Sequence, residues 1–290
     1  MSRAAVSSWV EAMRLRTLPV SVAGVLCAWA LAVEHGDWHA VPGAICIAFA
    51  VLAQIASNFA NEYFDYTAGR DRRGREGPRR GVTEGDITPR AMLRATLITI
   101  GVACCLGLSL VAWSGWWLLG VGVAIAAGVF AYSTGPYPLS TNGWGEVAVV
   151  AFFGLVPVNF TYYLMTGEWS GEVFRASVAM GLMGANVLII NNYRDTDDDR
   201  AVGKRTLSVR MGARSMPLLY LLSAATATAL LWPALTGLLP TWLSVLVYPL
   251  PAAGIAAAMP RRRGAALTPL LGMTAVTMLI TSAAMLIAAI

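Results

Sequence analysis

The chain carries few charged side chains, and this scarcity excludes an ordinary soluble protein. Of its 290 residues, 13% are Asp, Glu, Lys or Arg and 57% are hydrophobic, whereas a soluble domain carries about 25% charged residues. The charges that are present are confined to a few segments, so they cannot cover a water-exposed surface. The composition therefore indicates a membrane protein.

Cysteine and histidine are scarce as well. The four cysteines lie within apolar stretches, form no CxxC pair and have no histidine near them. The two histidines share one short polar segment with Glu34 and Asp37, which is typical of a solvated loop. The sequence therefore supports neither a disulfide framework nor a zinc site.

Long apolar runs dominate what is present. A helix crosses a bilayer with about 17 to 25 predominantly apolar residues, and nine runs of about that length follow one another along the chain. We therefore expect an all-α, polytopic membrane protein with nine transmembrane helices, forming a single domain over residues 1–290. The runs cover residues 17–33, 41–61, 92–113, 116–133, 146–166, 174–191, 216–236, 241–259 and 266–289.

The distribution of Lys and Arg predicts the orientation. With the N-terminus inside, the inside segments and Arg94 together hold 20 of the 21 basic residues, and Arg175 alone falls outside. Basic residues accumulate in short cytoplasmic loops, so we expect a cytoplasmic N-terminus and a location in the cell's inner membrane. The inside segments are 1–16, 62–91, 134–145, 192–215 and 260–265.

Two acidic clusters each follow a long apolar run. The first runs from Asn58 to Asp65 and continues to Asp71, and the second covers residues 191–199. Carboxylates at the mouth of a lipid-buried segment are costly to desolvate, so they indicate a functional site with cationic partners. By the orientation above, both clusters face the cytoplasm, in the two long loops 62–91 and 192–215.

The spacing within the clusters predicts metal binding. Asn61 and Asp65 are four residues apart, as are Asp195 and Asp199, and Asn58 lies on the same stripe as the first pair. If the helices continue, each pair projects from one helical face. Two facing helices would then offer oxygen ligands to a hard cation such as Mg²⁺, which usually completes its shell with water and substrate phosphates.

Basic residues near both clusters extend this interpretation to a diphosphate. Arginine binds phosphate oxygens in a bidentate manner, and lysine adds a point charge. Carboxylates, a metal ion and guanidinium groups together are typical of a diphosphate site. The basic residues concerned are Arg14, Arg16, Arg70, Arg79, Arg80, Arg194, Lys204 and Arg205.

Other interpretations stay open from the residues alone. A solvated, self-neutralising surface explains Asp197, Asp198, Arg72, Arg73 and Glu76 at least equally well. A cation-coupled transporter also uses intramembrane carboxylates, but it predicts polar groups on both faces, and the outer loops are almost empty of charge. A structural membrane protein would tolerate the loss of the aspartates.

The two clusters carry a resemblance to a known family. The pattern Asn61-Glu62-Tyr-Phe-Asp65 with Asp71, and the pattern running from Asn192 to Asp199 and on to Gly203-Lys204-Arg205-Thr206, resemble the UbiA superfamily of intramembrane aromatic prenyltransferases. Within it, the chain is most similar to the 1,4-dihydroxy-2-naphthoate polyprenyltransferases of menaquinone synthesis. Supporting stretches are residues 14–19, 77–80, 132–139, 145–146 and 152–156.

The resemblance implies a nine-helix bundle around a central cavity that binds a polyprenyl diphosphate through Mg²⁺. It implies that Asn61, Asp65, Asp195 and Asp199 hold the metal, with Asp71 as a further ligand. Lys204, Arg79 or Arg80, together with Arg14 and Arg194, would contact the diphosphate. Candidate acceptor or prenyl contacts are Asn58, Tyr132 and Asn192, whereas Tyr137 fits an interfacial anchor better.

The implied reaction joins the prenyl group to an aromatic ring. For dihydroxynaphthoate, the prenyl group replaces the ring carboxylate, and carbon dioxide and diphosphate are released. Three positions depart from the family pattern: Glu62 stands where Asp is usual, Leu15 where Pro is common, and Arg72 where Thr is often found. These departures leave open a prenyltransferase of specialised metabolism that acts on another phenol, quinol or quinolone.

Overall fold

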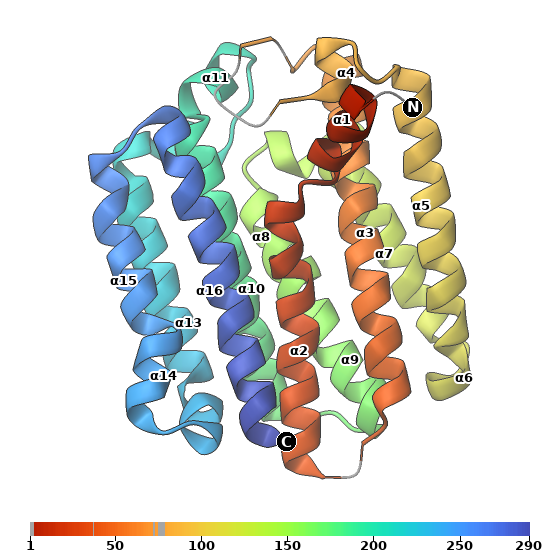
Figure 1. Cartoon of the computed structure of the whole chain (residues 1–290), viewed down its shortest axis with the longest axis vertical. Helices are drawn as coiled ribbons and strands as arrows, with labels where there is room; N and C mark the ends of the chain where they lie inside the picture. Colours follow the sequence, from red (N-terminus) through yellow and green to blue (C-terminus); the bar gives the residue numbers. More distant parts are fainter. Residues whose placement is uncertain (1–2, 37, 72, 75–78) are drawn as a thin grey trace.

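The computed structural model describes residues 3–36, 38–71, 73–74 and 79–290. Over these residues the chain folds into helices, and none of them forms a β-strand (Figure 1). Five positions named in the sequence analysis lie outside the described residues: Asp37, Arg72, Glu76 and the pair 77–78.

The helices coincide with the nine predicted apolar runs. Eight helical segments in the described part of the chain are long and apolar enough to cross a membrane, and the run at 116–133 forms a shorter apolar helix, α7. The segments are α2 (Leu18–His35), α3 (Ala40–Thr67), α5 (Pro89–Ser109) with α6 (Val111–Ser114), α7 (Leu118–Ser133), α8 (Gly145–Val149) with π-helix η3 (Val150–Leu155) and α9 (Val156–Thr166), α10 (Gly171–Arg194), α13 (Met216–Leu238), α14 (Thr241–Val247) with α15 (Pro249–Ala258), and α16 (Thr268–Ala289).

Local sequence signals explain where these helices begin and end. Pro89 starts α5, where its missing N–H costs nothing, and the Thr88 hydroxyl accepts a hydrogen bond from the Ala91 amide. The Ser170 side chain caps α10 in the same way. Gly167 ends α9 with a φ of 78°, a conformation that favours glycine. These three helix ends are therefore fixed by conventional capping residues.

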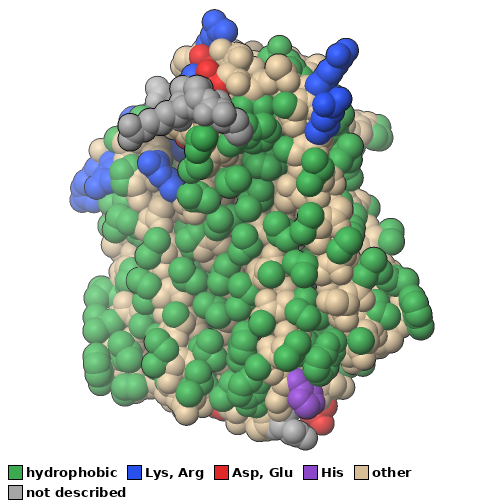
Figure 2. Space-filling view, turned by 45° about the vertical axis from the view of Figure 1, so that its right-hand side comes forward, with side chains coloured by type: hydrophobic (Ala, Val, Ile, Leu, Met, Phe, Trp, Pro, Cys, Tyr) green, Lys and Arg blue, Asp and Glu red, His purple; other side chains and the backbone are tan. Residues whose placement is uncertain are grey.

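The helices surround a central one. In Figure 1, α2 and α16 lie in front of α10, with α13 to α15 on one side of it and α3 and α5 to α7 on the other. In its most apolar window, 72% of α10 is buried inside the protein, compared with 17% for the segment containing α5 and α6. Apolar side chains cover the body of the molecule (Figure 2). Helix α10 is thus the core helix, and α5 faces outward.

One end of the bundle carries the polar loops. It holds α1 (Arg3–Met13), α4 (Gly81–Glu84), α11 (Thr196–Ala201) and α12 (Leu207–Met211), and we call it the loop-rich end (Figure 1). Two expected loops are partly helical there. Helix α3 runs on to Thr67, so residues 62–67 belong to it, and the segment 192–215 begins with the last turn of α10.

Candidate active site

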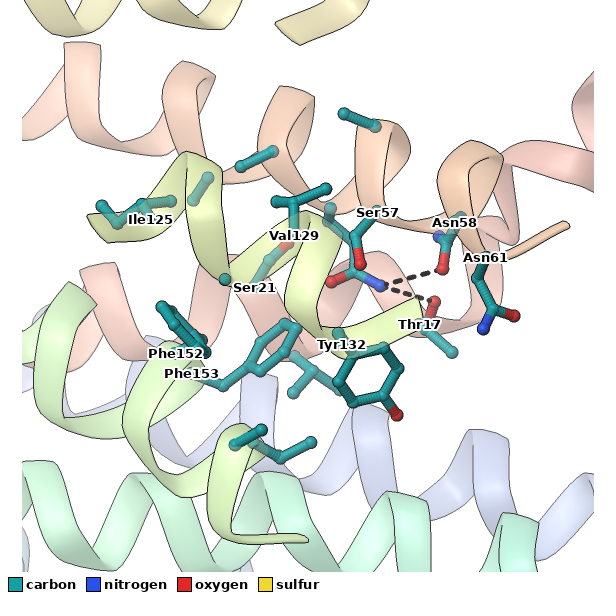
Figure 3. A pocket seen from close by; sticks show the side chains of 18 of the residues that line it. Thr17, Ser21, Ser57, Asn58, Asn61, Ile125, Val129, Tyr132, Phe152 and Phe153 are labelled. Atoms are coloured by element: carbon teal, nitrogen blue, oxygen red, sulfur yellow. Dashed lines mark hydrogen bonds between the residues drawn. The ribbon is translucent and has the colours of Figure 1, made fainter. Parts of the chain in front are cut away.

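A cavity of about 1030 Å³ lies between the helices, and its wall changes character along its length. At the loop-rich end the wall carries Asn, Asp, Arg and Lys side chains from α3, α10 and their loops. Deeper in the bundle it is apolar and is formed by α3, α5, α7, η3 and α9. Figure 3 shows the transition, with Asn58 and Asn61 near Tyr132 and the phenylalanines of η3 beyond it.

Helix α3 brings the first cluster to the cavity. Asn61 and Asp65 lie one turn apart on α3, and both line the cavity. The Asn61 Oδ1 atom accepts hydrogen bonds from Arg14 Nη2 at 2.9 Å and from Arg80 Nη2 at 3.2 Å. Asn58 also lines the cavity, but its Nδ2 donates to the Met13 carbonyl at 3.0 Å. Asn58 therefore ties the N-terminal segment to α3.

The end of α10 brings the second cluster to the same cavity. The backbone departs from the helix at Asp195, yet the Asp199 amide still donates to the Asp195 carbonyl at 2.8 Å, so both side chains reach the wall. Arg194 donates two hydrogen bonds to the Asp195 carboxylate, from Nε at 2.7 Å and from Nη2 at 2.9 Å. This bidentate contact uses two of the guanidinium nitrogens and orients the carboxylate.

The two clusters meet at Lys204. Its Nζ atom lies 3.1 Å from Asp65 Oδ2 and 3.8 Å from Asp199 Oδ1. Two carboxylates from helices far apart in the sequence therefore flank one ammonium group. This is the convergence that the paired spacing predicts, although the roles assigned to these residues stay predictions.

The oxygen atoms at this point suit a hard divalent cation. Asp65 Oδ1 is buried without a hydrogen-bond partner, and Arg70 Nη1 is 3.8 Å from it. The part of the chain that the structure describes holds no preassembled group of three or more His, Cys, Asp or Glu ligands. Mg²⁺ does not need one, because it keeps several waters and binds through one or two carboxylates plus phosphate oxygens. The donor set therefore fits Mg²⁺ that binds together with a phosphate ligand.

A second layer of charge lies behind the cavity wall. Arg80 is buried, and its Nε is 3.4 Å from Asp71 Oδ2, while its Nη1 is 4.0 Å from Glu62 Oε2. Glu62 Oε1 accepts a hydrogen bond from the Val82 amide at 2.9 Å. Neither Glu62 nor Asp71 is among the residues that line the cavity. These two carboxylates hold Arg80 in place, and the assignment of Asp71 as a metal ligand stays a prediction from the resemblance.

Arg14 reaches the site from an unusual backbone conformation. It links α1 to α2 with φ 52° and ψ 55°, and no other non-glycine residue in the described ranges has a positive φ. Such a conformation costs about 1–3 kcal/mol and persists where the surrounding structure imposes it. The turn directs the Arg14 side chain onto Asn61, at the polar end of the cavity.

Arg79 differs from its neighbour Arg80. Its side chain is half exposed at the mouth of the cavity, and it forms an ion pair with Asp86. The Arg79 hydrogen bond, aided by the Ser8 hydroxyl, lowers the pKa of the Asp86 carboxyl below its ordinary value. Arg79 thus joins α1 to the loop after α4, whereas Arg80 points at Asn61.

Tyr132 and Asn192 lie on the cavity wall, as the sequence predicts for an acceptor site. Asn192 Nδ2 donates a hydrogen bond of 2.7 Å to Glu146 Oε1, and Glu146 is buried. The sequence analysis gives Glu146 no role, although a carboxylate that opens an apolar run is a detectable signal. Tyr137 is 51% exposed and lies outside the cavity lining, in agreement with an anchoring role.

One predicted surface residue lies where the sequence suggests, and two residues of the cavity wall are absent from the sequence-based candidates. Asp197 is exposed and pairs with Arg200 at 3.2 Å, as a solvated surface predicts. Phe152 and Phe153 line the cavity but are absent from the sequence-based candidates. They belong to the π-helical segment η3, and apolar periodicity alone gives no sign of such a segment.

Most of the chain is similar to a known protein family and to its members. Residues 21–266 match the UbiA prenyltransferase family. The chain is similar to 1,4-dihydroxy-2-naphthoate octaprenyltransferase of Escherichia coli (strain K12), with 37% identity over 71% of this chain and 68% of that protein. It is 34% identical to the protein of the same name from Haemophilus influenzae, over 77% of this chain and 79% of that protein.

A solved structure shows the same fold. It is a UbiA homolog from Archaeoglobus fulgidus bound to DMAPP and Mg²⁺. It superimposes with a TM-score of 0.61 and 14% identity, over 96% of this chain and 99% of that one. At this identity the likeness concerns the arrangement of the helices.

Proposed function

Since the chain belongs to the UbiA prenyltransferase family, we propose that it transfers a polyprenyl group from a polyprenyl diphosphate to 1,4-dihydroxy-2-naphthoate. The products are demethylmenaquinone, carbon dioxide and diphosphate. The observation that carries this proposal is the position of Lys204 between the carboxylates of Asp65 and Asp199, at the polar end of a long apolar cavity. The names of the two bacterial relatives support this acceptor.

The polar end binds the diphosphate. Asn61, Asp65, Asp195 and Asp199 supply the oxygen ligands for Mg²⁺, which when bound neutralises charge on the leaving diphosphate. Arg14 and Arg80 donate hydrogen bonds to Asn61, and Lys204 pairs with Asp65. Their positions support the proposal that these three cations contact the phosphate oxygens. Their fixed charges stabilise the negative charge that develops as the allylic C–O bond breaks.

The apolar part of the cavity holds the prenyl chain. Helix α7 lines it from Leu118 to Tyr132, which is about 21 Å at 1.5 Å per residue. Such a wall is formed mostly by apolar side chains. It also excludes water, which would otherwise add to the allylic cation before the aromatic ring does.

The acceptor ring binds where the two parts meet. Tyr132 faces the cavity beside Asn61 and the η3 phenylalanines (Figure 3). Asn192 lines the same region, and because its amide nitrogen is held by Glu146, its Oδ1 is left to accept from a ring hydroxyl. These contacts orient the electron-rich ring carbon toward the allylic carbon.

The site opens to the cytoplasm in this proposal, and the protein resides in the bacterial inner membrane. The loop-rich end carries most of the basic residues, which accumulate in cytoplasmic loops. The polar end of the cavity is at this same end. A cytoplasmic opening would admit both a water-soluble naphthoate and the diphosphate head of the donor.

The test is a reconstituted reaction. The purified protein in detergent with Mg²⁺, octaprenyl diphosphate and 1,4-dihydroxy-2-naphthoate should form demethylmenaquinone, detected by mass spectrometry, and EDTA should abolish it. A panel of other phenols, quinols and quinolones separates the alternative acceptors. If no acceptor yields a prenylated product, the enzyme assignment is wrong, and cation transport in vesicles becomes the next measurement.

A further inference from the structure

The cavity has a contact between facing walls at Phe152 and Gly128. Phe152 belongs to η3, and its ring reaches across to α7, where it rests on the glycine. A Cβ atom placed on Gly128 would lie 2.8 Å from both Cε atoms of the ring and closer still to Cζ. Side chains larger than glycine therefore cannot occupy position 128 unless the ring moves.

The ring has little room to retreat. Segment η3 packs backbone to backbone on α10: a Cβ atom on Gly181 of α10 would lie 2.7 Å from the Val150 carbonyl oxygen. On the η3 side, a Cβ atom on Gly154 would lie still closer to the backbone of α10, 2.3 Å from the Ser177 carbonyl oxygen and 2.4 Å from the Gly181 nitrogen. Because packed interiors transmit strain instead of absorbing it, η3 cannot move away from α7. A larger side chain at position 128 would therefore turn the Phe152 ring into the cavity.

The contact lies just beyond the reaction centre. Gly128 is one turn of α7 from Tyr132, about 6 Å along the helix axis. In Figure 3, Phe152 and Phe153 lie between Tyr132 and Ile125. A chain held by its diphosphate near Lys204 must pass the Phe152 ring before it reaches the deep apolar wall around Leu118 and Leu164.

We propose that the Phe152 ring seated on Gly128 is the constriction that sets the enzyme's selectivity for the length of the prenyl donor. This inference rests on the proposed prenyl transfer and adds a residue pair that determines specificity. A donor with one isoprene unit has no chain to thread past the ring, whereas a polyprenyl donor must place most of its chain beyond it. Narrowing the passage should therefore penalise long donors selectively.

The chain offers a matched control for this test. Gly120 lies on the same helix but is not among the residues that line the cavity, and a Cβ atom there meets nothing within 4 Å. Gly128→Ala and Gly120→Ala add the same methyl group and the same helix propensity. They differ in whether the new methyl group meets Phe152.

The experiment measures kcat/KM with dimethylallyl, geranyl and octaprenyl diphosphates. We expect Gly120→Ala to match the wild type, and Gly128→Ala to lose about tenfold or more with octaprenyl diphosphate, because one misplaced methyl group in an apolar site is worth that much. The loss should shrink as the donor shortens. The double variant Gly128→Ala/Phe152→Leu should recover the long donor, since the smaller side chain makes room for the added methyl group.

Failure of this inference is distinct from failure of the proposed function. A wild-type protein that prenylates nothing would overturn both. Equal profiles for Gly128→Ala and Gly120→Ala, or an equal loss with all donors, would overturn the constriction alone. A double variant no better with octaprenyl diphosphate than Gly128→Ala would also overturn it, because the effect would then not pass through the ring.

Discussion

Replacing Lys204 by methionine should destabilise the protein and make its stability depend on Mg²⁺. The Lys204 side chain is 12% exposed and that of Asp65 is 1% exposed, so their contact is nearly buried. Removing one partner of a buried ion pair costs up to about 3–5 kcal/mol, and in this variant Arg70, 3.8 Å away, would still partly offset the Asp65 charge. The neighbouring Asp199 carboxylate adds repulsion that Lys204 also offsets.

Mg²⁺ should restore most of this loss in the variant. Binding at about 100 times the dissociation constant stabilises the folded state by about 2.7 kcal/mol. In the wild type, Mg²⁺ must compete with the ammonium group for the same oxygens. A unit charge about 4 Å away is worth about 4 kcal/mol at an effective dielectric constant of 20, so removing it should tighten Mg²⁺ binding by at least about tenfold.

Thermal unfolding in detergent, with and without Mg²⁺, and calorimetric titration of Mg²⁺ measure both effects without any substrate. Arg205→Met is the matched control, because the neighbouring Arg205 side chain is exposed and its loss changes the net charge equally. Prenyl transfer by Lys204→Met should still fail, since the proposed function gives Lys204 a contact with the diphosphate as well. Equal Mg²⁺ affinity in wild type and variant, or destabilisation that Mg²⁺ does not relieve, would refute the reasoning.

Three further predictions follow from the polar end. Glu62→Ala should cost about 1–3 kcal/mol of stability, measured by thermal unfolding, because it leaves a buried amide unpaired; unchanged Mg²⁺ affinity would separate this role from that of a ligand. Asp86→Asn should lower the melting temperature near pH 7. Because the pKa of Asp86 is lowered in the folded protein, its carboxylate stabilises the fold only while it is ionised, so the difference from the wild type should vanish as the pH falls through that pKa. A difference that persists in acid would contradict this prediction. Glu146→Ala should raise the KM for the naphthoate by about tenfold and leave the KM for the donor unchanged in steady-state assays, because Asn192 loses its orienting partner; equal shifts in both would argue against it.

The fold and much of the site could be predicted from the sequence because hydrophobic length and charge placement act locally. Each apolar run coincides with a helical segment of the described residues, and eight of these segments are long and apolar enough to cross a membrane. The spacing predicts that Asn61 and Asp65 project from one helical face and that Asp195 and Asp199 project from another. The end of α3 was placed too early, at 61, because the polar residues after it were interpreted as a loop. In the structure they remain helical, since their side chains find partners inside the protein.

What could not be predicted depends on contacts between segments distant in the sequence. Lys204 is 139 residues from Asp65, and only the folded bundle brings them together. Phe152 and Gly128 form a pair because η3 is locked onto α10 by glycines on both sides. Sequence periodicity reports which residues face a neighbour, but it does not report which neighbour, or how closely.

The distinction between the two charge layers also explains a departure from the family pattern. The usual aspartate at position 62 is a glutamate here, and a longer side chain on the cavity wall would displace a metal ion. The structure places Glu62 behind the wall, where its extra methylene group lets it reach both the Val82 amide and Arg80. The substitution therefore alters how Arg80 is supported, and the oxygen atoms that face the cavity from Asn61 and Asp65 are unaffected. A change in side-chain length should for this reason be tolerated better at position 62 than at position 65, because the Asp65 carboxylate lines the cavity directly.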